Sequence, residues 1–84
     1  MTDTKIKVLY FAQVAELLDK REELWPARPD LTVEKLLDEL CTHYSALEPL
    51  KERLQVAINH YHAQPGDTVS ANDEVAVFEP VTGG

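Results

Sequence analysis

A single apolar stripe in the middle of the chain limits the possible folds more than any other part of the sequence. Between residues 33 and 44, apolar side chains recur at the spacing of one helix face: Val33, Leu36, Leu37, Leu40, Cys41 and Tyr44. Thr32 is a good N-cap for this helix, and Glu34 places a negative charge in the first turn, where it suits the helix dipole. Leu31 and Leu36 match a hydrophobic staple. A helix with one apolar face must bury that face, so we expect it to lie on a sheet.

Segments that alternate apolar and polar residues lie on both sides of the predicted helix. We expect strands at residues 6–11, 54–59 and 74–78, and a shorter strand at residues 23–25 that Pro26 ends. Residues 12–18 change to a helical period. Residues 60–63 either continue the third strand or turn, and in the connector at residues 46–53, Pro49 could begin a short helical turn.

The order of these elements predicts a two-layer α+β domain. A β-grasp (ubiquitin-like) arrangement fits it: a mixed sheet with one main helix packed on one face, and the last strand beside the first. We expect residues 1–80 to form this domain and residues 81–84 to form a flexible tail that contains Gly83 and Gly84.

Composition excludes several classes of function. Eight basic and fifteen acidic residues give a formal charge of −7, without a Lys/Arg cluster, which argues against nucleic acid and membrane surfaces as partners and favours a partner with a basic docking surface. The single cysteine, Cys41, excludes an internal disulfide and fits a reducing compartment. Since the sequence shows neither a signal peptide nor a membrane span, we expect a cytoplasmic protein.

Few side chains are arranged for catalysis. His60 and His62 are two residues apart, but a metal site needs three or four ligands, and neither Cys41 nor His43 has a partner at ligand spacing. The chain has no Gly-rich phosphate loop and no recognisable nucleophile motif. We therefore expect no metal, no stably bound cofactor and no enzymatic activity of the chain on its own.

Apolar residues on the side of the sheet away from the helix predict a partner surface. If the first and last strands are neighbours, four side chains share this open face: Leu9, Phe11, Ala76 and Phe78. The alternatives are a reversed register or coverage of the face by residues 12–18.

The segment after the last strand, Pro80-Val81-Thr82-Gly83-Gly84, has two interpretations. Two glycines lack side chains that pack, so the segment could be a disordered stub. Alternatively, the carboxylate of Gly84 is the reactive group, because Gly-Gly can enter a narrow channel that a Cβ would block.

Three pieces of the sequence resemble a known family. They are the opening residues 6–14, the helix start at residues 32–34, and residues 73–78 running into the Pro-Val-Thr-Gly-Gly ending. The chain is similar over its length to the ubiquitin-like sulfur carriers, and most to the small subunits of molybdopterin synthase. It departs from them at Glu79, where the family often has proline, and at Ala15, where it often has arginine.

The resemblance implies a function in molybdenum cofactor (molybdopterin) biosynthesis. An E1-like enzyme would use ATP to adenylate the Gly84 carboxylate, and a sulfur donor would convert the adenylate to a thiocarboxylate. The large synthase subunit, in a heterotetramer, would receive the tail and pass the sulfur to cyclic pyranopterin monophosphate. Gly83 would share the channel, and the partner contacts would be Phe11, Phe78, Pro80, Val81 and Thr82. A thiamine-type sulfur carrier, a ubiquitin-like protein modifier and a non-reactive binding module remain as alternatives.

Overall fold

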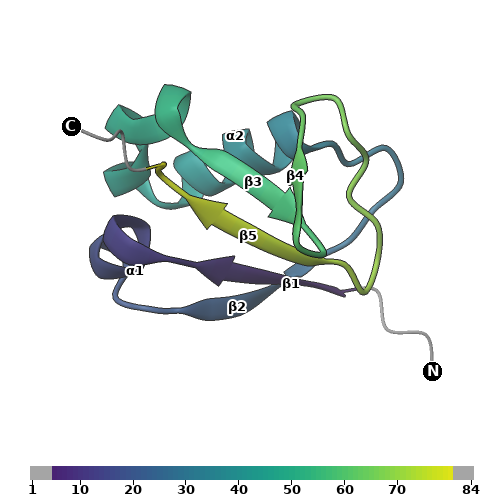
Figure 1. Cartoon of the computed structure of the whole chain (residues 1–84), viewed down its shortest axis with the longest axis horizontal. Helices are drawn as coiled ribbons and strands as arrows, with labels where there is room; N and C mark the ends of the chain where they lie inside the picture. Colours follow the sequence, from purple (N-terminus) through teal and green to yellow (C-terminus); the bar gives the residue numbers. More distant parts are fainter. Residues whose placement is uncertain (1–4, 81–84) are drawn as a thin grey trace.

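A mixed sheet and one long helix form the two layers of the domain (Figure 1). The computed structural model describes residues 5–80, so the predictions for Val81, Thr82, Gly83 and Gly84 lie outside the described residues. Its elements are β1 (Lys5–Tyr10), α1 (Ala12–Leu18), β2 (Glu22–Pro26), α2 (Val33–His43), the 3₁₀ helix η1 (Ser45–Arg53), β3 (Gln55–Ile58), β4 (Tyr61–Ala63) and β5 (Glu74–Phe78).

The sheet has the strand order β2-β1-β5-β3-β4. Its central pair, β1 and β5, is parallel, and the three other pairs are antiparallel. The predicted adjacency of the first and last strands is therefore confirmed, as is the β-grasp class with its mixed sheet.

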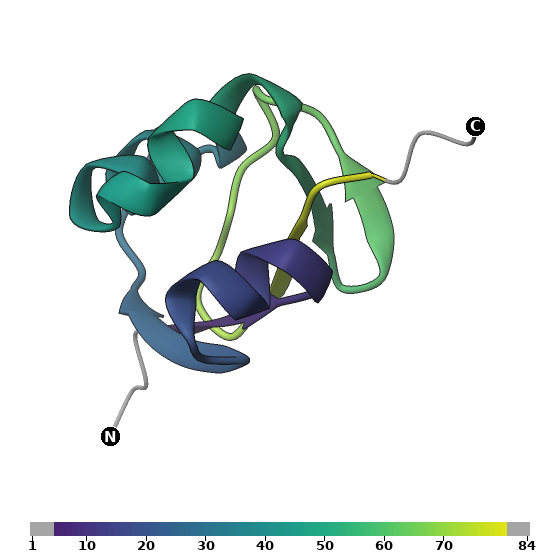
Figure 2. The ribbon, with the colours of Figure 1, turned by 90° about the vertical axis from the view of Figure 1, so that its left-hand side faces the viewer.

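The helix α2 begins and packs as its sequence predicts. Thr32 is the N-cap, and its hydroxyl oxygen accepts a hydrogen bond from the backbone N–H of Lys35 at 3.3 Å. Figure 2 shows α2 on one side of the sheet. The hydrophobic core contains side chains from the helix and from the sheet. The helix contributes Val33, Leu36, Leu40 and Cys41, and the strands contribute Ile6, Val8, Tyr10, Val56, Val75 and Val77.

Several predicted boundaries are wrong. The strand predicted at residues 54–59 is Gln55–Ile58, and the strand predicted at residues 23–25 is Glu22–Pro26, which includes Pro26 because its missing N–H is tolerated on an edge strand. The first strand ends at Tyr10, and Phe11 is the extended residue that precedes α1. Pro49 lies inside η1 rather than at its start. Leu47 and Leu50 explain η1, because residues three apart line up on one face of a 3₁₀ helix and both side chains are buried.

The structure also decides between the two possibilities left open for residues 60–63. Asn59 and His60 have positive φ angles of 50° and 77°, as the two central residues of a tight hairpin turn do. The chain therefore turns at this point, and β4 returns along β3 with Ile58 opposite Tyr61.

Candidate functional site

The open face of the sheet, on the side away from α2, carries the predicted apolar residues. Leu9 and Ala57 both lie opposite Ala76, on β1 and β3 respectively. Phe78 projects on the same side as Ala76, because the two residues are two apart on one strand. We define the docking face as Leu9, Phe11, Ala57, Ala76 and Phe78.

Phe11 and Phe78 are brought together at one end of this face. The backbone N–H of Phe11 donates a hydrogen bond to the carbonyl oxygen of Val77 at 3.3 Å, which holds Phe11 beside the end of β5. The Phe11 side chain is 48% exposed, and Phe78 is half-buried. The two aromatic residues are thus accessible at the point where the chain leaves the sheet.

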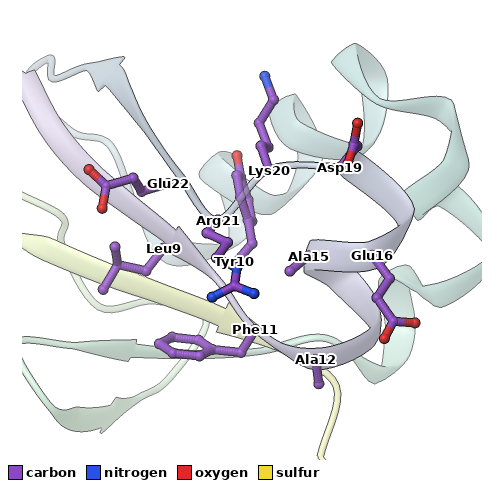
Figure 3. Close-up of a pocket in the computed structure, with 10 residues that line it drawn as sticks. All are labelled: Leu9, Tyr10, Phe11, Ala12, Ala15, Glu16, Asp19, Lys20, Arg21 and Glu22. Atoms are coloured by element: carbon purple, nitrogen blue, oxygen red, sulfur yellow. The ribbon is translucent and has the colours of Figure 1, made fainter.

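Sequence reasoning missed Ala57 and Arg21. Ala57 joins the docking face only through the β3–β5 register, which the sequence does not specify. Arg21 lines a hollow of about 620 Å³ together with Leu9, Phe11 and Ala15. Figure 3 shows the Arg21 side chain pointing toward Phe11, so a cation lies beside the apolar residues. This chain has alanine at position 15, so the cation here comes from Arg21 and not from that position. Nothing in the sequence around Arg21 distinguishes it from other surface cations.

An ion pair lies at the exit of the chain from the sheet. Phe78 is the last residue of β5, paired with Gln55 of β3, and Pro80 cannot donate to a further ladder bond. Between them, the carboxylate of Glu79 lies 3.2 Å from the Nε atom of Arg53, the last residue of η1. The Glu79 side chain is only 16% exposed, whereas that of Arg53 is 66% exposed.

The strongest electrostatic cluster lies on the opposite, helix-facing side of the sheet, around Glu23 of β2. Four side chains donate hydrogen bonds to its carboxylate: Tyr10, Lys20, Trp25 and Tyr44. Burial alone raises the pKa of Glu23, but these hydrogen bonds outweigh it and hold the pKa at about 2. Burial and the contact with Glu23 raise the pKa of Tyr10. The cluster joins β1, β2 and the end of α2, and each donor in it is directed at the carboxylate.

Other candidates for chemistry are isolated. Within residues 5–80, His, Cys, Asp and Glu side chains form no group of three or more that could hold a metal ion. Burial raises the pKa of the Cys41 thiol, which lies 3.8 Å from the carbonyl oxygen of Leu47. Of the described helices, none has the length and apolar character needed to cross a membrane.

Comparison with known proteins places the chain in a family. A family model described as the ThiS family matches residues 8–84. The molybdopterin synthase sulfur carrier subunit of Mycobacterium tuberculosis is 35% identical over 82 residues, with 95% of this chain and 98% of that protein covered.

Solved structures agree with this fold. Small archaeal modifier protein 1 of H. volcanii superposes with a TM-score of 0.81 at 29% identity, over 93% of this chain and 99% of that chain. A ubiquitin of Caldiarchaeum subterraneum superposes with a TM-score of 0.64 at 16% identity over 99% of this chain and 100% of that one, which shows the shared fold alone. The match over residues 8–84 and the relative of nearly equal length lead to one conclusion: the chain belongs to the ThiS family.

Proposed function

We propose that this chain is a sulfur carrier of molybdenum cofactor biosynthesis and that the Gly84 carboxyl group carries the sulfur. The observation that carries the proposal is the full-length similarity to a molybdopterin synthase sulfur carrier subunit, within a family match that reaches residue 84. The Gly-Gly sequence at residues 83 and 84 supplies a main-chain carboxylate without neighbouring side chains.

The proposed reaction needs activation before sulfur transfer. A carboxylate oxygen of Gly84 attacks the α-phosphate of ATP on an E1-like enzyme, and pyrophosphate leaves. Sulfur at the oxidation level of sulfide (HS⁻), supplied by a donor, then attacks the acyl carbon and displaces AMP with loss of a proton, which leaves a thiocarboxylate on Gly84. In the large synthase subunit, the thiocarboxylate sulfur would bond to a carbon of cyclic pyranopterin monophosphate and displace an oxygen substituent from that carbon. Water would then cleave the resulting thioester, which returns Gly84 as its carboxylate and leaves the sulfur on the pterin.

The remainder of the chain serves recognition in this proposal. The described residues hold no cluster suited to metal binding, and the carboxylate of their most strongly hydrogen-bonded acid, Glu23, is occupied by four donors. We therefore assign the acid, base and oxyanion-stabilising groups to the partner enzymes. The large subunit would bind the docking face, with Phe11 and Phe78 as its anchors, in a heterotetramer.

The deciding experiment changes the position of the reactive carbon. The chain is thiocarboxylated by its activating enzyme with ATP and a source of sulfide-level sulfur, which adds about 16 Da by exchange of oxygen for sulfur and is verified by mass for each variant. It is then mixed with the large subunit and the pterin precursor. One alanine added after Gly84 moves the terminal carbon by about 3.3–3.6 Å, and a 1 Å misplacement can cost on the order of 100-fold in rate. We expect the extended chain, and a chain lacking Gly84, to unfold normally and to transfer no sulfur. Normal turnover by a chain whose extension is still intact afterwards would contradict the proposal.

One observation favours a second candidate function. The structural similarity to small archaeal modifier protein 1 extends over nearly the whole chain at 29% identity, and the same activated carboxylate could acylate a lysine of a target protein. Proteins carrying branched Gly-Gly adducts on lysine, found only when this chain is present, would show modification. The remaining carrier alternative, thiamine synthesis, is tested by asking whether loss of the chain causes a thiamine requirement or loss of molybdenum cofactor.

A further inference from the structure

We infer that Arg53 and Glu79 form a positioning pair that fixes the direction in which the chain leaves the sheet toward its reactive end. The inference rests on the proposed function and deepens it, because it assigns a role in presenting the tail to two residues outside the docking face. Neither residue would touch the reacting atoms.

The location of the pair is its first support. The β3–β5 ladder ends with Gln55 opposite Phe78, and Pro80 lacks the N–H that could extend it. Beyond the end of the ladder, the carboxylate of Glu79 lies 3.2 Å from the Nε atom of Arg53 and so connects the segment after β5 to the end of η1. This ion pair restrains the backbone at the position where the chain leaves the sheet.

The burial of the two side chains is the second support. The Glu79 side chain is 16% exposed and so is largely shielded from solvent, whereas the side chain of Arg53 is 66% exposed. The backbone of Arg53 is held in place, because Arg53 ends η1 and precedes Leu54, which is buried. A side chain that starts at the end of η1 thus contacts the residue that follows β5.

A small restraint on the backbone angle at Glu79 has a large effect on the position of the chain end. The four residues beyond Pro80 span at most about 13 Å, so a change of angle at Glu79 displaces the far end by several ångströms. Fixing the origin reduces the number of directions that the free chain samples and so raises the fraction of encounters in which the tail meets its channel. Once the tail is bound, the pair has no further effect, so we expect it to influence KM and not kcat.

The principal test is Glu79→Gln in the full-length thiocarboxylated chain. We expect the KM for sulfur transfer to the large subunit to rise about two- to fivefold, the effect of losing one exposed ion pair, with kcat unchanged. Arg53→Gln should give the same change, and the exchange Arg53→Glu with Glu79→Arg should restore KM. The matched control is Asp38→Asn, which makes the same charge change and breaks the exposed Lys51–Asp38 pair elsewhere on the surface.

Two further measurements separate this inference from its rivals. Backbone ¹⁵N relaxation of the isolated chain should show increased motion after Pro80 in Glu79→Gln but not in Asp38→Asn. In chains that end at Pro80, Glu79→Gln should leave affinity for the large subunit unchanged. An unchanged KM, an equal KM increase in Asp38→Asn, unchanged relaxation, or weaker binding that persists in the shortened chain would each overturn the inference. Absence of sulfur transfer by the wild-type chain would overturn the proposed function, while the relaxation data would still decide whether the pair restrains the chain.

Discussion

Glu23 shows how one residue can join three elements. Its carboxylate lies between β2 and α2 with a side chain 20% exposed, and hydrogen bonds from Trp25 at 2.8 Å and Tyr44 at 2.7 Å meet there. Lys20, from the connection between α1 and β2, donates to both Glu23 and Tyr44. An unpaired carboxylate in this position would be costly, so the donors and the acid stabilise the fold only as a set.

We expect Glu23→Gln to destabilise the domain in a pH-dependent way. The pKa of Glu23 falls from an ordinary 4.5 to about 2 on folding, so its contribution is complete above the unfolded pKa and is lost as the pH falls toward 2. The difference in free energy of unfolding should be about 3 kcal/mol at neutral pH, should decrease as the pH falls below 4.5 and should be lost as the pH falls through 2. Urea unfolding from pH 7 to pH 2 measures it, with the exposed neighbour Glu22→Gln as control. A difference that stays constant with pH would show that the carboxylate charge is not the stabilising feature.

At the scale of elements, α2 ties the two layers together. Leu40 is fully buried in the middle of its apolar face. Leu40→Ala should lower the free energy of unfolding by about 2–5 kcal/mol, because it removes buried methyl groups and leaves a cavity. Leu17→Ala on α1, where the side chain is 43% exposed, should cost less than about 1 kcal/mol. A loss below about 0.5 kcal/mol for Leu40→Ala would mean that the helix faces another way.

The elements were predictable where periodicity is local, and unpredictable where register decides. The α2 stripe, its Thr32 cap and the strand Glu74–Phe78 follow from spacing alone. By contrast, the contact between Arg53 and Glu79 depends on how β3 is aligned with β5, and Glu23 meets Tyr44 only after the sheet and α2 have packed. Residues 60–63 were ambiguous because a positive φ at His60 is set by the hairpin, not by histidine.

At the scale of the whole molecule, the two sides of the sheet differ in burial. One side buries the core, and the docking face stays accessible with Phe11 and Phe78 at one end. If the docking face binds the partner as proposed, substitutions on it should change binding without unfolding the domain.

We therefore expect Phe78→Ala to weaken binding to the large synthase subunit by about 2 kcal/mol, roughly 30-fold in Kd, with the Tm nearly unchanged. Titration calorimetry and thermal unfolding of the same samples measure the two effects. Tyr61→Ala is the matched control, because Tyr61 is 79% exposed on β4 but lies outside the docking face. If Phe78→Ala unfolds the chain, Phe78 belongs to the core and not to the interface.

The position of β5 has a consequence for synthesis on the ribosome. It is the last strand in sequence but lies in the middle of the sheet, between β1 and β3. A nascent chain that ends before residue 74 therefore lacks the strand that joins the two halves, and both β1 and β3 present unpaired edges. Native pairing between β1 and β5 must wait until residue 78 has been translated, which makes closure of the sheet a late step in folding. Because β5 supplies Ala76 and Phe78, the docking face is assembled only after this strand is in place, and a chain that lacks β5 lacks the face.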